Sequence, residues 1–366
     1  MTDKLNATRR REPLTDAQLL MTISIGIFVA MYALAMIFMG GGFLKVQQIF
    51  DLLNDNAALI IVSCSLTIVM IGGGINISVG GVIGFTVMAC AIFLNNNAEG
   101  SGFLSITLTV LLALGIGLGF GLLEGFLVSY LEIQPFIVTL AGMFLARGLT
   151  TILSVNPVKV AHEGFQELVK AKIKIPWLGY TAQNGNLIPA KLEIGAVVAL
   201  CVVLLICLML RYVRFGRNIY AIGGNQQSAM MLGINVKRTR FISYVISGLL
   251  SGLAGFVFIL HKPAGNASVA MRSEMDAIAS SIIGGTLLTG GVGNVIGTFF
   301  GAMILATIQK IIALSPLNAS WWQEMANGAM LSFFILLQSL VLMRKNRARA
   351  KKRKEIKEKE KKKDES

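Results

Sequence analysis

The chain has 366 residues, of which 54% are hydrophobic and 14% charged, and its mean hydropathy is +0.70. Soluble domains have about 25% charged residues, so this composition excludes an ordinary soluble protein and predicts a polytopic membrane protein. The formal net charge of +14 lies at the two ends and in one connection, which favours membrane topology over nucleic-acid binding as its explanation.

Residues 1–18 are polar and lack the pattern of a removable signal peptide, so they are predicted to be a cytoplasmic N-terminus. About 20 apolar residues cross a bilayer as a helix. Residues 19–343 are therefore predicted to form an all-α membrane domain with ten crossings, at about Leu19–Met39, Ala57–Ile71, Val82–Leu94, Leu104–Leu131, Phe136–Leu153, Ile194–Leu210, Phe241–Leu260, Met275–Ile283, Val295–Leu314 and Met325–Met343.

The connections predict the orientation. Lys and Arg concentrate in the N-terminus, in the loop over residues 211–240 and in the charged tail over residues 344–366. Cytoplasmic segments are enriched in these residues, so both termini and this loop are predicted to be cytoplasmic. The loop over residues 154–193 is then extracytoplasmic. It has a helical pattern around Glu163–Lys174, and it is either a small cap that meets a partner or a spacer.

Two uncharged, glycine-rich stretches interrupt the apolar runs, at Ile71–Gly84 and Gly284–Gly297. Such stretches are typical of broken helices around a substrate path. The neutral polar groups of these stretches suit a sugar or polyol better than an ion; they are Asn76, Ser78, Thr286 and Thr289. Tight helix packing through small residues is the alternative interpretation.

Ionisable residues inside the predicted crossings are costly and therefore suggest function. Glu124 and Arg147 lie within crossings four and five, and they either form a neutralising pair or contact substrate. Glu274 and Asp276 lie at the start of crossing eight, where negative charge also favours a helix N-terminus.

The sequence contains no nucleotide-binding glycine loop, no HExxH motif, no nucleophile elbow and no Cys/His cluster. We therefore predict that the chain is not an enzyme, binds no cofactor and has no metal site. Its two histidines, His162 and His261, fall in predicted external connections.

The cytoplasmic loop carries the most specific pattern, from Arg214 to Val236. Gly223-Gly224-Asn225 predicts a turn ending in a cap residue, and Gln226–Leu232 predicts one to two helical turns that Gly233 stops. A short cytosolic helix that joins the two halves of a membrane domain is well placed to transmit movement from an energy-supplying protein bound on the cytoplasmic side.

At these residues the chain resembles the membrane permeases of bacterial ABC importers for simple sugars, the ribose/galactose class, and most of all galactofuranose-type permeases. Further matching motifs occur in order: Gly73–Gly80, Gln134–Met143, Glu274–Ala279, Ile283–Thr286 and Gly290–Gly293. The likeness spans about Leu19 to Met343. Asn76 stands where that family usually has Asp, and Glu124 where Asn is common, which leaves the identity of the sugar open.

The resemblance implies a half-transporter in the bacterial plasma membrane that moves substrate by alternating access. Its implied partners are an ATPase subunit that uses the ATP, a second permease chain (identical or different), an extracytoplasmic sugar-binding protein and the lipid bilayer, with no nucleic acid. The implied ATPase contact comprises Gly216, Arg217, Ala221, Gly223, Gly224, Asn225, Ala229, Gly233, Ile234 and Asn235. The predicted substrate pathway comprises Asn76, Ser78, Glu124, Thr139, Arg147, Asp276, Thr286 and Thr289.

Two other functions fit parts of the pattern. A nucleoside importer would use the same architecture. A proton- or sodium-coupled carrier would use titrating acids such as Glu124 and Asp276 and would transport alone under an ion gradient. The cytosolic loop favours the ABC permease.

Overall fold

The computed structural model describes residues 16–39, 43, 45–97, 102–181, 187–314, 322, 325–337, 339 and 343. The charged tail and the first 15 residues lie outside the described residues. The helices are α1 Asp16–Met39, α2 Gln47–Asp55, α3 Ala57–Ile71, α4 Val79–Asn96, α5 Gly102–Ser129, α6 Pro135–Leu153, α7 Glu163–Lys170, α8 Ile194–Tyr212, α9 Arg214–Gly224, α10 Gln226–Met231, α11 Val236–His261, α12 Ser273–Ile283, α13 Val295–Leu314 and a last apolar helix, Met325–Leu337. The strands are β1 Val158–Lys159, β2 Lys172–Thr181, β3 Leu187–Glu193 and β4 Ala264–Gly265.

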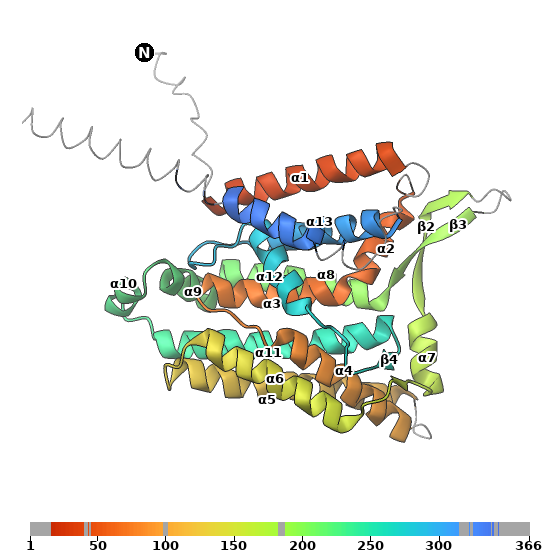
Figure 1. Ribbon diagram of the computed structural model, residues 1–366, viewed down its shortest axis with the longest axis horizontal. Helices are drawn as coiled ribbons and strands as arrows, with labels where there is room; N and C mark the ends of the chain where they lie inside the picture. The colour runs from red at the N-terminus through yellow and green to blue at the C-terminus, as the bar shows by residue number, and fades with distance from the viewer. Residues whose placement is uncertain are drawn as a thin grey trace, which may run out of the picture.

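The long helices lie side by side as a bundle, with α9 and α10 at one end and α7, β2 and β3 at the other (Figure 1). In the described part of the chain, seven helices are long and apolar enough to cross a membrane. The pair α2 and α3, bent by 60°, makes an eighth if it counts as one span. The chain is thus a mostly helical, multi-pass membrane protein. Ten crossings stay a prediction, because α12 has only 11 residues and Met325–Leu337 is also short.

The first glycine stretch interrupts a helix, as predicted. Helix α3 ends at Ile71, Gly73 adopts a left-handed φ of 77°, and the chain then runs without helix until α4 begins at Val79. The Tyr244 hydroxyl of α11 donates a hydrogen bond to the Ile75 carbonyl at 3.2 Å. Gly73 is exposed, whereas Asn76, Ser78 and the first turn of α4 are buried, so the break runs from the surface into the interior of the protein.

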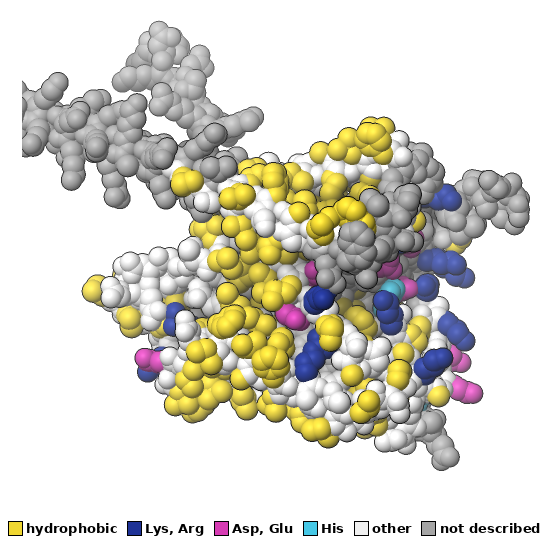
Figure 2. Space-filling model, in the orientation of Figure 1, with side chains coloured by type: hydrophobic (Ala, Val, Ile, Leu, Met, Phe, Trp, Pro, Cys, Tyr) yellow, Lys and Arg dark blue, Asp and Glu magenta, His cyan; other side chains and the backbone are white. Residues whose placement is uncertain are grey.

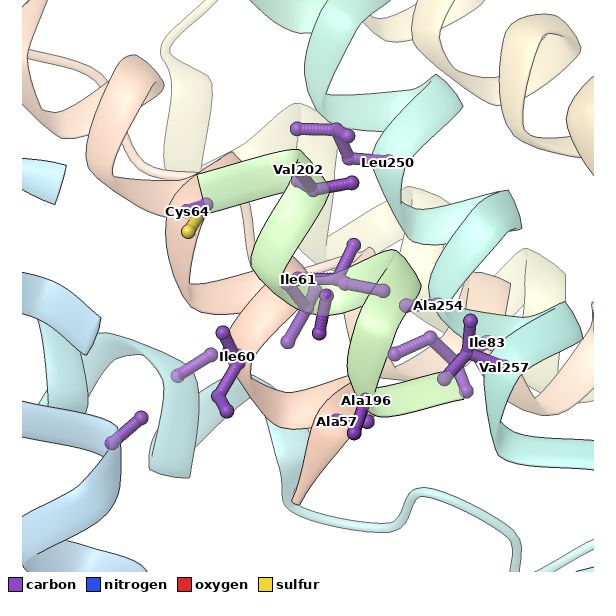
Figure 3. Packing of buried hydrophobic residues seen from close by; sticks show 14 of the residues in the cluster. Ala57, Ile60, Ile61, Cys64, Ile83, Ala196, Val202, Leu250, Ala254 and Val257 are labelled. Atoms are coloured by element: carbon purple, nitrogen blue, oxygen red, sulfur yellow. The ribbon is translucent and has the colours of Figure 1, made fainter. Parts of the chain in front are cut away.

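Helix α3 occupies the centre of the bundle, where α8, α11, α12 and α13 pack around it. Figure 3 shows Ile61 of α3 among Val202 of α8 and Leu250 and Ala254 of α11. Helices α5 and α11 approach closely because Gly117 and Gly248 face each other. A Cβ at either glycine would collide with the backbone of the other helix. Small residues at a crossing give this close approach, and it strengthens van der Waals packing in a membrane.

The loop over residues 154–193 differs from its prediction. Helix α7 ends at Lys170, and Lys172–Lys174 belongs to β2, which pairs antiparallel with β3. The helical expectation to Lys174 is therefore wrong, and the chain is not purely α-helical. The alternation Lys-Ile-Lys-Ile from Lys172 explains the strand, because alternating polar and β-branched residues suit a sheet with two different faces.

Surface composition follows the long axis of the bundle. Figure 2 shows charged side chains gathered around the β2–β3 end, a few at the α9–α10 end, and hydrophobic side chains covering much of the surface between them. Bilayer-crossing proteins have this apolar girdle. The bundle axis of Figure 1 is therefore taken as the membrane normal.

Candidate functional site: the coupling segment and the buried polar cluster

The predicted cytoplasmic loop consists of two helices, α9 and α10, joined at Asn225. The Asn225 side chain caps α10 by accepting a hydrogen bond from the Ser228 amide at 2.9 Å. Gly233, with a φ of 78°, follows the end of α10. The predicted cap and stop are confirmed. The predicted turn at Gly223-Gly224 is wrong, because both glycines belong to the last turn of α9.

The other residues of the implied ATPase contact stabilise the α9–α10 segment through contacts within the chain. Gly216 packs on the Leu210 backbone, the Arg217 guanidinium donates to the Tyr212 carbonyl at 3.2 Å, and Ala221 lies on α9. Beyond α10, the Ile234 amide donates to the carbonyl of buried Ala229 at 3.1 Å. Asn235 caps α11 by accepting from the Arg238 amide at 2.9 Å. These contacts give the segment a defined shape.

The tip of α10 is apolar and exposed. Met231 is 88% exposed and Leu232 is 79% exposed, next to Met230. Figure 1 shows α10 as the element that projects furthest at its end of the bundle. Exposed apolar side chains on a projection outside the bilayer indicate a partner surface. The glycine and asparagine pattern did not point to these three residues; the Met-Met-Leu run itself was the available signal.

The base of this segment meets both glycine stretches at one point, which we call the glycine junction: Ile71, Gly223, Gly290 and Gly291. The Gly291 amide donates to the Ile71 carbonyl at 2.8 Å, and Gly223 packs on both atoms. Gly290 and Gly291 have left-handed φ values of 85° and 75°. Only glycine fits such a turn against another backbone at low cost.

Tyr220 makes a second connection from α9 to the same turn. Its hydroxyl donates to the Gly293 carbonyl at 2.8 Å, and burial raises the pKa of this phenol to about 12, with a smaller contribution from Cys207. The phenol therefore stays protonated and donating at any physiological pH. Through this hydrogen bond, movement of α9 would displace the turn between α12 and α13.

The second glycine stretch does not repeat the geometry of the first. It forms the compact turn that packs on α9 and on the end of α3. Thr286 is buried beside Gly293, whereas Thr289 is exposed. Thr286 and Ile71 both lie against Gly293, and the Thr289 carbonyl lies near Gly73. The polar side-chain contacts of Asn76 and Ser78 are instead with each other, with Ser247 and with Glu124.

Asn76, Ser78 and Glu124 form a buried polar cluster. The Asn76 amide donates to the Ser247 hydroxyl at 3.0 Å, and the Ser78 hydroxyl donates to the Asn76 side-chain carbonyl at 2.8 Å. Glu124 is 1% exposed; its carboxyl lies beside both residues and against Gly142, and its Oε1 has no hydrogen-bond partner. Burying a carboxyl without a cation partner is costly. The polar contacts of Glu124 with Asn76 and Ser78 tie α5 to the helix break.

The predicted Glu124–Arg147 pair does not form. The Arg147 guanidinium donates to the Val269 and Ala270 carbonyls at 2.6 and 2.8 Å, and its acidic neighbour is Glu274. Glu274 is buried in the first turn of α12, against Gly80. Of the two alternatives for these residues, pairing is therefore wrong, because Glu124 and Arg147 lie at different levels of antiparallel helices.

Two further predicted pathway residues have partners within the chain. The Thr139 hydroxyl is buried and donates to the Pro135 carbonyl at 2.9 Å. Asp276 accepts from the Asn327 amide at 3.0 Å and from the Gln309 amide at 3.5 Å. Ser247, Gln309 and Asn327 are partners that the sequence reasoning missed, because single amides and hydroxyls in apolar helices carry no local signal.

Comparison with known proteins gives a consistent result. Residues 48–336 match the family described as branched-chain amino acid transport system / permease component. The inner membrane ABC transporter permease protein YjfF of Escherichia coli is 39% identical, over 89% of this chain and 93% of its own length. The fructose import permease protein FruG of Bifidobacterium longum is 32% identical, with the same coverage of both chains.

The ribose import permease protein RbsC of Escherichia coli is 29% identical, over 81% of this chain and 87% of its own length. No solved structure matches the chain. The family match covers most of the sequence, including the helix break between α3 and α4, the α9–α10 segment and the glycine junction. The chain therefore belongs to the branched-chain amino acid transport system / permease component family of membrane permeases.

Proposed function

We propose that this chain is the permease subunit of an ATP-binding cassette importer that moves a simple sugar across the bacterial plasma membrane. The relatives named for import of fructose and ribose support the substrate class. Alternating access would be powered by ATP hydrolysis in a separate subunit. The chain would bind no cofactor and carry out no chemical reaction itself.

The observation that carries the mechanism is the position of α9 and α10. Their apolar tip, Met231 and Leu232, is exposed outside the bundle, while their base packs on the glycine junction. An ATPase that holds the tip would therefore move the end of α3 and the α12–α13 turn together. In this proposal α9, α10 and residues 233–235 form the ATPase contact.

The same proposal sets the topology and the other partners. The α9–α10 end is cytoplasmic, with both termini, and the β2–β3 end is extracytoplasmic, where a sugar-binding protein would deliver substrate. Ten crossings would require α12 and the region after Met325 each to enter the membrane. A second permease chain, identical or different, completes the path.

Reconstitution tests this function. The chain is placed in proteoliposomes with its ATPase, second permease chain and binding protein, and uptake of radiolabelled sugars and nucleosides is measured with and without ATP. We expect sugar uptake that requires ATP and every partner. Uptake by the chain alone under a proton or sodium gradient would instead establish an ion-coupled carrier, and ATP-dependent uptake of nucleosides alone would change the substrate class.

A further inference from the structure

The segment between β4 and α12 has an irregular backbone, which local turns and a side chain of α6 hold in place. Ala270 and Arg272 adopt left-handed φ values of 52° and 70°, which are unfavourable for residues other than glycine. The Arg147 guanidinium donates to two successive carbonyls of this segment, Val269 and Ala270. This bidentate clamp fixes the backbone in a conformation that the sequence alone does not favour.

The segment lies within the depth of the membrane-spanning bundle. Arg147 precedes Leu153, the end of α6, by six residues, or about 9 Å at 1.5 Å per residue. The Ala270 carbonyl packs on Gly80 in the first turn of α4, and α4 continues from there to Asn96, about 24 Å away. Figure 1 shows the chain running from β4 into the middle of the bundle before α12 begins.

Exposed residues of this segment and of the first turn of α12 form what we call the loop face: Met271, Arg272 and Met275. Met271 is 62% exposed, Met275 is 53% exposed, and Arg272 is also exposed. In Figure 2 a small group of acidic and basic side chains lies midway between the two ends of the bundle. Irregular backbone and charged side chains at membrane depth are tolerated only where they meet protein or line a water-filled cavity.

The buried polar cluster cannot provide such a cavity in this conformation. Asn76, Ser78 and Glu124 are each almost fully buried and contact one another. The loop face is different, because its side chains are exposed at the surface of the bundle. Cys201 of α8 is an exposed residue of an uninterrupted apolar helix, seven residues from its outer end, and so serves as a reference for the surface of an ordinary spanning helix.

We propose that the loop face lines the sugar path, with the second permease chain forming the opposite wall. This inference rests on the proposed function. The Arg272 guanidinium donates hydrogen bonds to sugar hydroxyls, and the methionine side chains contact the apolar C–H surface of the ring. Arg147 is a positioning residue here: it holds the Val269–Ala270 backbone so that the loop face turns outward.

Thiol accessibility tests the proposal in the complete complex. Met271→Cys and Met275→Cys are each made with Cys201→Ala and Cys207→Ala, and are labelled from outside with a membrane-impermeant sulfonated thiol reagent. Cys207→Ala alone, which retains Cys201, is the depth-matched control. We expect both loop-face cysteines to be labelled at least tenfold faster than Cys201, because a hydrophilic reagent reaches only surfaces that are exposed to water.

Labelling of both loop-face cysteines no faster than Cys201 would overturn the proposal, and two positions keep the test usable if one variant fails to accumulate. Arg147→Lys keeps the charge but loses the bidentate clamp, so it is expected to slow labelling of Met271→Cys. ATP-driven sugar uptake by the wild-type complex tests the proposed function separately. A complex that takes up sugar but leaves the loop face unlabelled contradicts only this inference.

Discussion

The amide of Gly291 donates a hydrogen bond to the carbonyl of Ile71 across 220 positions of sequence, with an N to O distance of 2.8 Å. Gly223 packs against both atoms. The end of α3, the end of α9 and the α12–α13 turn therefore meet without intervening side chains. In a transporter driven from outside the membrane, this backbone contact would pass displacement of α9 to both glycine stretches at once.

The two neighbouring glycines of α9 should respond differently to the same substitution. A Cβ at Gly223 would collide with Ile71 and Gly291, whereas a Cβ at Gly224 meets nothing within 4 Å. We expect Gly223→Ala to lower the unfolding free energy by about 1–3 kcal/mol and to reduce ATP-driven uptake strongly. Thermal unfolding in detergent and uptake in proteoliposomes measure both effects. Gly224→Ala is the matched control for stability, and an equal loss of stability in the two variants would exclude the junction as the sterically sensitive point.

The apolar tip of α10 should be required for ATPase binding but not for folding. Met231→Ser and Leu232→Ser change exposed side chains, so the thermal stability of the chain is expected to stay unchanged. Burial of one such side chain at an interface contributes about 1.5–3 kcal/mol, which corresponds to at least a tenfold weaker association with the ATPase. Co-purification and titration of the ATPase measure this loss. Lys170→Ala, an exposed change in α7 at the opposite end of the bundle, should bind normally.

The buried polar cluster makes Gly142 intolerant of a side chain. A Cβ at Gly142 would collide with the Glu124 carboxyl and approach Ser78, whereas a Cβ at Gly148 of the same helix has open space. We expect Gly142→Ala to cost about 1–3 kcal/mol of unfolding free energy. Gly148→Ala should be neutral or stabilising, because alanine favours helix by about 1 kcal/mol over glycine. Partial recovery in the double variant Gly142→Ala, Glu124→Ala would identify the carboxyl as the obstacle; no recovery would place the strain elsewhere.

Acid should loosen the β2–β3 end of the bundle through Glu193. Burial raises the pKa of this carboxyl, but hydrogen bonds from His261 and Lys172, both at 2.8 Å, outweigh burial and lower its pKa overall. A lowered pKa in the folded state means that the stabilisation is complete above the unfolded value of about 4.3 and is lost as pH falls through the folded value. Thermal unfolding between pH 6 and pH 3, run on wild type and Glu193→Gln, measures the difference.

Below about pH 4.3 the wild-type stability should fall more steeply than that of Glu193→Gln, because only the wild type loses this ionised carboxylate. Glu167→Gln removes an exposed carboxylate of α7 and serves as the control. Parallel curves for wild type and Glu193→Gln would show that the contacts of Glu193 contribute nothing in this range.

Several helices could be placed from sequence to within two or three residues. Helix α13 begins and ends where the apolar run does, and α6 begins at Pro135, next to the predicted start at Phe136. A membrane span must satisfy its own backbone hydrogen bonds over about 20 apolar residues. The local sequence therefore determines where such a helix begins and ends. The cap at Asn225 and the stop at Gly233 were equally local, since each depends on one residue and its neighbours.

What the sequence by itself determined was therefore the class of molecule, most spans and the two glycine stretches. Only the tertiary structure decided what the glycines touch: Gly223 meets Ile71 and Gly291, and Gly142 meets Glu124. It also decided that Arg147 binds the carbonyls of Val269 and Ala270 instead of Glu124. The physical reason is the same in each case. Helix formation is set by neighbours along the chain, whereas close approach and polar pairing depend on distant segments whose relative height in the bundle no local pattern encodes.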